Sequence, residues 1–129
     1  MSGPSPLTTF CNMLVRFFEE LKDTFPEERE IKMALETIQN AKKINPRLIL
    51  DMFYEHVTGP LREPIANEDE GRIITYARSM VNAQFNEILP AISIFDKHWA
   101  GLGDSNRTAI WKYLKVLVAL SDKAKTVRV

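Results

Sequence analysis

The chain is poor in the residues from which disulfides and metal sites are built. Its 129 residues include one cysteine, Cys11, and two histidines, His56 and His98. A single cysteine forms no disulfide within a chain, and neither histidine has a Cys, Asp or Glu at a spacing that recurs in zinc sites. The acids beside them, Glu55 and Asp96, stand one and two positions away, where helical side chains do not face each other. We therefore expect no metal site and no cofactor.

Motifs of catalysis and of calcium binding are also missing. The sequence has no G-x-S-x-G, no phosphate-binding G-x-x-x-x-G-K-[ST] and no G-x-G-x-x-G. Cys11 stands beside Phe10 without a neighbouring base, which favours a small core residue over a nucleophile. The acidic run NEDEG, which ends at Gly71, fails as a calcium loop because Ala66 and Ala77 would fall on acidic ligand positions. Its acids suit the start of a helix instead, and we expect a protein that is not an enzyme.

Neither an excess of one charge nor a long apolar run is present. The 17 basic and 17 acidic residues give a formal net charge of zero, whereas dedicated nucleic-acid binders usually carry a basic excess. No segment approaches the roughly 18 to 20 apolar residues of a membrane-spanning helix, and the start, MSGPSPLTTF, lacks the features of a signal peptide. We therefore expect a soluble, intracellular protein.

What the sequence does contain is helical periodicity. Apolar residues recur every three or four positions over most of the chain, as in amphipathic helices. The clearest stripe is Phe10, Leu14, Phe17, Phe18, Leu21 and Phe25. Helices are predicted over residues 8–24, 26–43, 45–58, 71–89, 91–100 and 104–122. These predict an all-α fold, a compact bundle of five to six short helices with mostly antiparallel neighbours, because the connections are short.

Prolines and glycines divide the chain. The first segment, 1–7, is rich in small residues and predicts a flexible N-terminal arm. A single helical domain is expected over 8–122, and a basic C-terminal tail over 123–129. Asn45 and Pro46 predict the cap and first position of a helix. Gly59 and Pro60 predict the end of that helix and the start of a loop over 59–71. The loop is either irregular throughout or contains one short turn around residues 61–65, and Leu61 and Ile65 would anchor it.

The C-terminal part combines aromatic and basic residues. Trp99 falls on an apolar stripe and is expected in the core, whereas Trp111 lies about 100° from Ile110, at the stripe's edge. Trp111 would either cover a neighbouring helix or belong to an exposed patch. The predicted partner-binding residues lie off the stripes: Tyr54, Tyr76, Trp111 and the loop 59–71. The candidate nucleic-acid contacts form a local basic excess: Arg107, Lys112, Lys115, Lys123, Lys125 and Arg128.

Several short segments resemble proteins of one viral group. The segments FFEEL (17–21), FPEE (25–28), NPR (45–47), DKHW (96–99) and IWKYL (110–114) resemble a set of small helical proteins encoded by large DNA viruses of algae and protists. The resemblance extends over most of the chain, which is richer in Ala and Val than those Lys-, Asn- and Ile-rich proteins. It implies an infected-cell cytoplasm or a virion as the setting. It brings no catalytic residue, because no activity is established for the set.

Two functional hypotheses follow. The first is a non-enzymatic interaction or structural module, such as a small virion-associated or assembly protein, with a protein partner or self-association. The alternative is a nucleic-acid accessory protein that uses the basic, aromatic C-terminal helix, with salt-dependent retention of DNA or RNA. The sequence indicates no small-molecule substrate.

Overall fold

The fold is a bundle of helices, as predicted. The computed structural model describes residues 5–79 and 97–126, and no strand occurs among them. Its elements are α1 (Pro6–Thr24), α2 (Arg29–Ile44), α3 (Pro46–Phe53), the π-helical turn η1 (Tyr54–Thr58), α4 (Gly59–Ala66), α5 (Glu70–Ser79), the 3-10 turn η2 (Trp99–Gly101) and α7 (Asp104–Thr126). The helix predicted over 91–100 lies mostly outside the described residues, as does the second half of the one predicted over 71–89.

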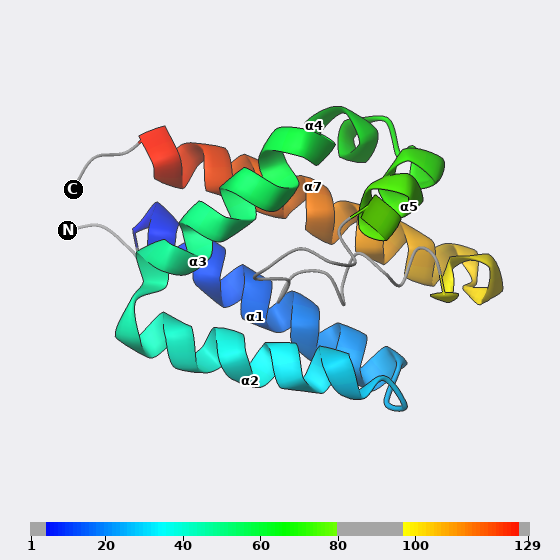
Figure 1. Cartoon of the computed structure of the whole chain (residues 1–129), viewed down its shortest axis with the longest axis horizontal. Helices are drawn as coiled ribbons and strands as arrows, with labels where there is room; N and C mark the ends of the chain where they lie inside the picture. The colour runs from blue at the N-terminus through cyan, green and yellow to red at the C-terminus, as the bar shows by residue number, and fades with distance from the viewer. Residues whose placement is uncertain (1–4, 80–96, 127–129) are drawn as a thin grey trace.

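The long helices α1, α2 and α7 set the frame of the bundle. α1 lies between α2 and α7 and runs antiparallel to both, and α3, η1 and α4 cross beside α1 and α7 (Figure 1). The first turn of α1 and the last turn of α7 lie at the same end of the molecule (Figure 1). Each of the three helices therefore turns its apolar stripe toward a neighbour, as the periodicity requires.

Aromatic side chains of α1 form the centre of the core. Phe10 and Phe18 are fully buried, and the ring of Phe10 meets that of Phe53 edge-on, with 5.1 Å between the ring centres. Leu117 of α7 belongs to the same core and is also fully buried. Burying each such side chain contributes roughly 1.5–3 kcal/mol. Cys11 is 1% exposed, and burial raises the pKa of its thiol, which confirms that it is a small core residue.

The outer ends of the bundle differ from the prediction. α1 begins at Pro6, inside the predicted arm, because the hydroxyl of Ser5 accepts the amide of Thr8 at 3.1 Å and caps the helix. α7 continues to Thr126 through most of the predicted tail. Ala124, which is 3% exposed, gives this last turn a buried side. The helical part is thus longer at both ends than the periodicity indicated.

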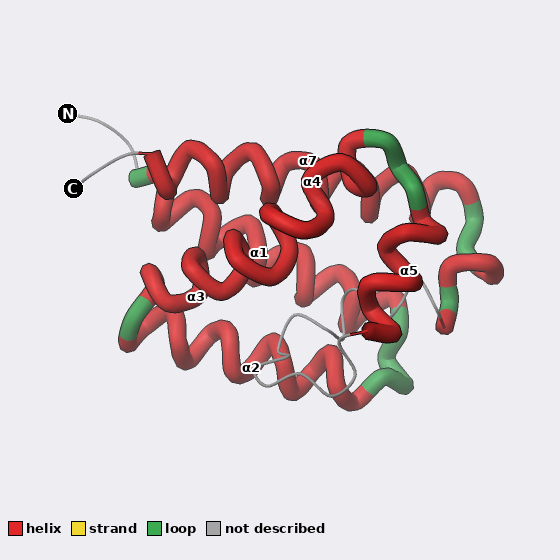
Figure 2. The backbone as a smooth tube through the Cα atoms, turned by 45° about the horizontal axis from the view of Figure 1, so that its top comes forward, coloured by secondary structure: helices red, strands yellow, loops and turns green. Residues whose placement is uncertain are grey.

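The predicted helix end at Gly59 is wrong. The chain stays helical from α3 through η1 into α4 (Figure 2), so most of the expected loop is α4. Pro60 has no amide hydrogen to donate into a helix. The turn before it is wider than an α-helical turn, because the Gly59 amide donates to the Tyr54 carbonyl, five residues earlier. Leu61 and Ile65, each 2% exposed, hold α4 on the core, as the anchoring prediction required.

A buried polar pair joins this widened turn to α7. The hydroxyl oxygens of Thr58 and Ser121 lie 2.7 Å apart, and both residues are fully buried. Ser121 also donates to the carbonyl of Val118, at 2.8 Å. Since a serine hydroxyl has one proton, Thr58 is the donor in the pair. The hydrogen bond from Thr58 to Ser121 therefore forms only when η1 and α7 are correctly aligned.

We predict that Ser121→Ala lowers the free energy of unfolding by about 1–3 kcal/mol, because it leaves the buried Thr58 hydroxyl without its acceptor. The double variant Thr58→Val, Ser121→Ala should lose less than the sum of the two single variants, since it removes both polar groups. Urea denaturation measures these differences.

The matched control is Thr37→Ala, whose hydroxyl stands on an exposed position of α2 and whose loss should change stability by less than about 0.5 kcal/mol. Equal stability of Ser121→Ala and Thr37→Ala would contradict the proposed role of the pair.

Candidate functional site

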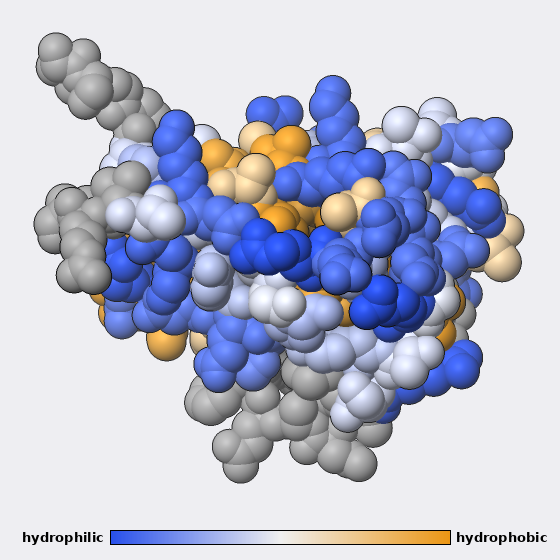
Figure 3. All heavy atoms as spheres, turned by 90° about the horizontal axis from the view of Figure 1, so that it is seen from above, coloured by the Kyte–Doolittle hydropathy of each residue, from blue (hydrophilic) through white to orange (hydrophobic). Residues whose placement is uncertain are grey.

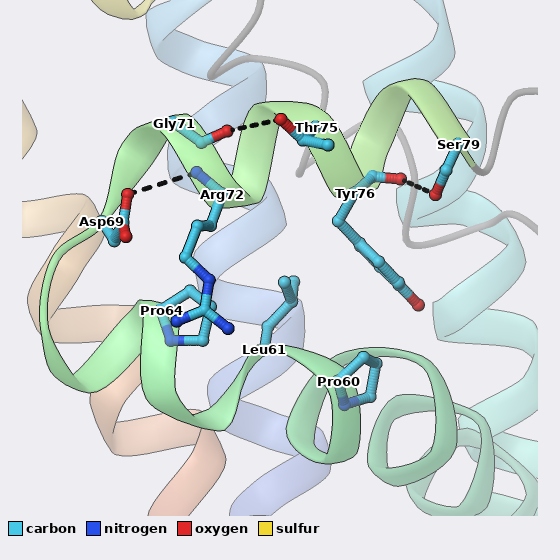
Figure 4. A pocket seen from close by; sticks show the side chains of 9 residues that line it. All are labelled: Pro60, Leu61, Pro64, Asp69, Gly71, Arg72, Thr75, Tyr76 and Ser79. Carbon is cyan, nitrogen blue, oxygen red and sulfur yellow. Dashed lines mark hydrogen bonds between the residues drawn. The ribbon is translucent and has the colours of Figure 1, made fainter.

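The candidate site is an open groove between α4 and α5. It has a volume of about 700 Å³, which falls within the usual range of ligand sites. The side chains that line it come from both helices and from the turn that joins them (Figure 4): Pro60, Leu61, Pro64, Asp69, Gly71, Arg72, Thr75, Tyr76 and Ser79. Two predictions meet here, since Tyr76 and much of the segment 59–71 were expected to contact a partner.

A tight turn between the two helices shapes the groove. Asp69 donates its amide to the Pro64 carbonyl at 2.8 Å and accepts the amide of Arg72 on its carboxylate at 3.2 Å. Asp69 therefore caps α5, as expected of the acids in this run. Glu68 has a φ of 53°, a left-handed conformation that reverses the chain. The ammonium of Lys115, 2.6 Å from the Glu68 carboxylate, ties this turn to α7.

Tyr76 fixes the other end of the groove. Its hydroxyl donates to the carbonyl of His56 at 2.5 Å, across from α5 to η1. In a regular helix this carbonyl would accept the amide of the residue four positions later, but that residue is Pro60, which has none. The Tyr76 hydroxyl gives this carbonyl a donor from another element. Burial raises the pKa of Tyr76, so the hydroxyl keeps its proton at neutral pH.

The surface of the groove combines apolar side chains with a few polar groups. Pro60 is exposed and supplies apolar contact area, whereas Leu61 and Pro64 line the groove but are buried. The Arg72 guanidinium, 4.0 Å from Glu63, places a positive charge at the rim. The hydroxyls of Thr75 and Ser79 donate to carbonyls of their own helix, at 3.0 and 2.7 Å (Figure 4). They present acceptor lone pairs to the groove. Among the lining residues that the structure describes, no nucleophile stands beside a base.

Trp111 is placed in the core. It is 7% exposed and meets Trp99 edge-on, with ring centres 5.3 Å apart. The exposed-patch alternative is therefore wrong, and the ring that Trp111 meets belongs to the 3-10 turn η2. The buried face of α7 is wide enough to include both Ile110 and Trp111, as is common for a helix with neighbours on two sides. Tyr54 is half-buried on η1, with the ammonium of Lys125 5.3 Å from the centre of its ring.

Three of the six predicted nucleic-acid contacts have partners within the chain. Arg107 donates twice to the Trp99 carbonyl, at 3.1 and 2.8 Å, and lies over the Trp99 ring. Lys115 pairs with Glu68, and Lys125 pairs with Asp51 at 3.0 Å. Lys112 and Lys123 are exposed, and Arg128 lies outside the described residues. Three of the five described α7 cations thus contact neighbouring elements, which weakens the nucleic-acid hypothesis.

A further ion pair joins α4 to α7. The Arg62 guanidinium forms a two-pronged contact with the Asp122 carboxylate, at 2.6 and 2.8 Å. This contact lowers the pKa of Asp122 and raises that of Arg62. Hydrophilic side chains cover most of this side of the molecule and separate small apolar patches (Figure 3). The charges of this side are thus partly neutralised by one another.

A pair that sequence reasoning missed lies at the start of α2. The Nε2 atom of His98 is 2.8 Å from a carboxylate oxygen of Glu28, 70 residues away in sequence. The Phe25 ring stacks on the imidazole with 4.5 Å between ring centres. The hydrogen bond from His98 lowers the pKa of Glu28. A sequence pattern relates residues that are close along the chain, so it does not indicate a contact over this separation.

Comparison with protein-family models, with curated proteins and with solved structures found no match to the chain. Within residues 5–79 and 97–126, no helix combines the length and the apolar content needed to cross a membrane.

We predict that Tyr76→Phe lowers the free energy of unfolding by about 1 kcal/mol, because the His56 carbonyl loses its donor. Tyr113→Phe is the control, since the hydroxyl of Tyr113 contacts Glu20 where both groups are exposed to water and its loss should cost less. Urea denaturation compares the two, and a larger effect for Tyr113→Phe would contradict the assignment.

The Arg62–Asp122 pair predicts a pH dependence. Because the pKa of Asp122 is lower in the folded chain, the pair stabilises the fold above the unfolded pKa of aspartate, about 3.9. This contribution is lost as pH falls through the still lower folded value. Urea denaturation should therefore show Arg62→Gln less stable than the parent protein at neutral pH, and equal to it once the pH lies well below the folded pKa of Asp122. The control is Arg47→Gln, at an exposed position of α3; a deficit of Arg62→Gln that persists in acid would refute the pairing.

Proposed function

We propose that the protein is a non-enzymatic helical interaction module that receives a segment of a partner protein in the groove between α4 and α5. The observation that carries this proposal is the groove itself. Its described lining includes the exposed Pro60, the buried Leu61 and Pro64, and the opposite charges of Arg72 and Asp69. Apolar walls with a few placed polar groups are typical of binding sites. The preferred partner segment offers an apolar side chain to the prolines and a carboxylate to Arg72.

Hydrogen bonds at both ends of the groove fix its shape. The Tyr76 hydroxyl is bonded to η1, and Glu68 is bonded to Lys115 of α7. The two helices therefore need little further ordering when a partner arrives. A preformed site loses less conformational entropy on binding, which favours affinity.

The nucleic-acid alternative has less support. Of the basic residues on which it depends, Arg107, Lys115 and Lys125 are engaged within the chain. Neutralising phosphates with these residues would require breaking those contacts. Binding of DNA or RNA is therefore retained as an outcome of the test below and is not proposed as a second function.

The resemblance to small helical proteins of large DNA viruses supports a more specific form of this proposal. In that form the partner is another component of the virus, and the protein acts in the infected-cell cytoplasm or in the virion. Mass spectrometry of purified particles tests this form: recovery of the chain in constant proportion to a capsid protein would support it, and its absence from particles would restrict the protein to the infected cell.

We predict that a photo-crosslinking amino acid placed at Thr75, in the groove, captures a partner protein, whereas the same residue at Thr37 on α2 does not. Both positions are exposed helical threonines, so the comparison separates the groove from the surface in general. Thr75→Arg should abolish capture by a crosslinker placed at Ser79, since the added side chain fills the groove.

Mass spectrometry of the crosslinked peptides identifies what occupies the groove. A second copy of this chain would assign the groove to self-association, and another protein would assign it to a partner. Equal capture from positions 37 and 75, or a crosslink to nucleic acid at position 75, would overturn the proposal.

A further inference from the structure

Three side chains with metal-binding donors meet where the α1–α2 turn approaches η2. They are Glu27, Glu28 and His98, and one donor atom from each lies within 4.8 Å of the others. Glu28 and His98 are half-buried and Glu27 is exposed. The helix α2 starts directly after Glu28, whose side chain does not cap it but turns to His98 instead. The Glu28 carboxylate therefore binds the His98 imidazole and not the amides at the start of α2.

We propose that Glu27, Glu28 and His98 form a binding site for a divalent transition-metal cation, for which Zn²⁺ is the preferred ion. Imidazole nitrogen and carboxylate oxygen are common zinc donors, and three protein ligands leave further positions for water. Mg²⁺ and Ca²⁺ prefer sites made of oxygen alone, so the histidine selects against them. This site uses none of the residues that line the α4–α5 groove, and it stands independently of the proposed function.

The distances require only small side-chain movements. Zinc bonds to nitrogen and oxygen of about 2.0–2.2 Å at a tetrahedral angle place two ligand atoms roughly 3.4 Å apart. The contact between His98 and Glu28, now 2.8 Å, would open by about 0.6 Å. The widest separation, at most 4.8 Å, would close by up to about 1.4 Å. The exposed side chain of Glu27 has the freedom to make the larger of these movements.

Neighbouring groups already orient the two inner ligands. The Phe25 ring stacks on the imidazole of His98 and fixes its plane. The ammonium of Lys97 lies 3.6 Å from Glu28 Oε1, the oxygen that does not contact His98. It leaves Oε2 as the metal ligand, in the manner of outer-sphere partners that hold carboxylates in metal sites. Lys97 also repels a cation, so the site should bind more weakly than a structural zinc site.

The two histidines of the chain provide a matched test. The full-length protein, stripped of metal with a chelator, is titrated with Zn²⁺ by isothermal calorimetry, and the variants His98→Gln and His56→Gln are titrated in parallel. The glutamine side chain introduced by His98→Gln can still form a hydrogen bond with Glu28, which protects the fold, and circular dichroism verifies that each variant is helical. We expect one Zn²⁺ per chain for the parent protein and for His56→Gln, and at least roughly tenfold weaker binding for His98→Gln.

A second variant and a second ion complete the test. Glu27→Gln should weaken Zn²⁺ binding, whereas Mg²⁺ should bind to no variant at the concentrations where Zn²⁺ saturates. In NMR spectra, Zn²⁺ should shift the ring signals of His98 and leave those of His56 in place. No binding to the parent protein, equal binding by His98→Gln, or loss of binding in His56→Gln would each overturn the proposal.

Discussion

The missing amide hydrogen of Pro60 organises one half of the molecule. A proline inside a helix removes a donor and crowds the carbonyl four residues before it. Here the chain responds with the π-helical turn Tyr54–Thr58, which continues directly into α4. Two consequences follow: Thr58 lies against Ser121 in the core, and the carbonyl of His56 receives the Tyr76 hydroxyl. The α4–α5 groove is therefore a product of the same proline that was expected to end the helix.

Electrostatic contacts of α7 support this arrangement from the other side. Lys115 reaches Glu68 in the α4–α5 turn, Arg62 of α4 reaches Asp122, and Lys125 reaches Asp51 of α3. Exposed ion pairs of this kind contribute little each to stability, but together they fix the register of one element against another. Two of the C-terminal cations thus have counter-charges within the chain: Asp51 of α3 pairs with Lys125, and Glu68 of the turn after α4 pairs with Lys115.

The sequence predicted well where one local rule acts alone. The all-α class, the buried stripe of α1, the Asn45 cap and the use of the acidic run at a helix start are confirmed, since each depends on neighbours within one or two turns. The predictions were wrong or incomplete where a residue far away in the sequence determines the local structure. The pair Gly59 and Pro60 is typical of a helix end. The chain nevertheless stays helical here, because Leu61 and Ile65 are buried in the core. The contact of His98 with Glu28 spans 70 positions, which no periodicity encodes. The partner-binding role of Tyr54 and Tyr76 stays a prediction.

The crystal structure of the Pro60→Ala variant, compared with that of the parent protein, tests the central claim most directly. If the absent amide hydrogen causes the arrangement, the amide of residue 60 will bond to the His56 carbonyl in the variant. The π-helical turn will then narrow, and the Tyr76 hydroxyl will leave that carbonyl, while the parent protein keeps both features. A variant in which the turn and the contact of Tyr76 with His56 are both unchanged would contradict the account.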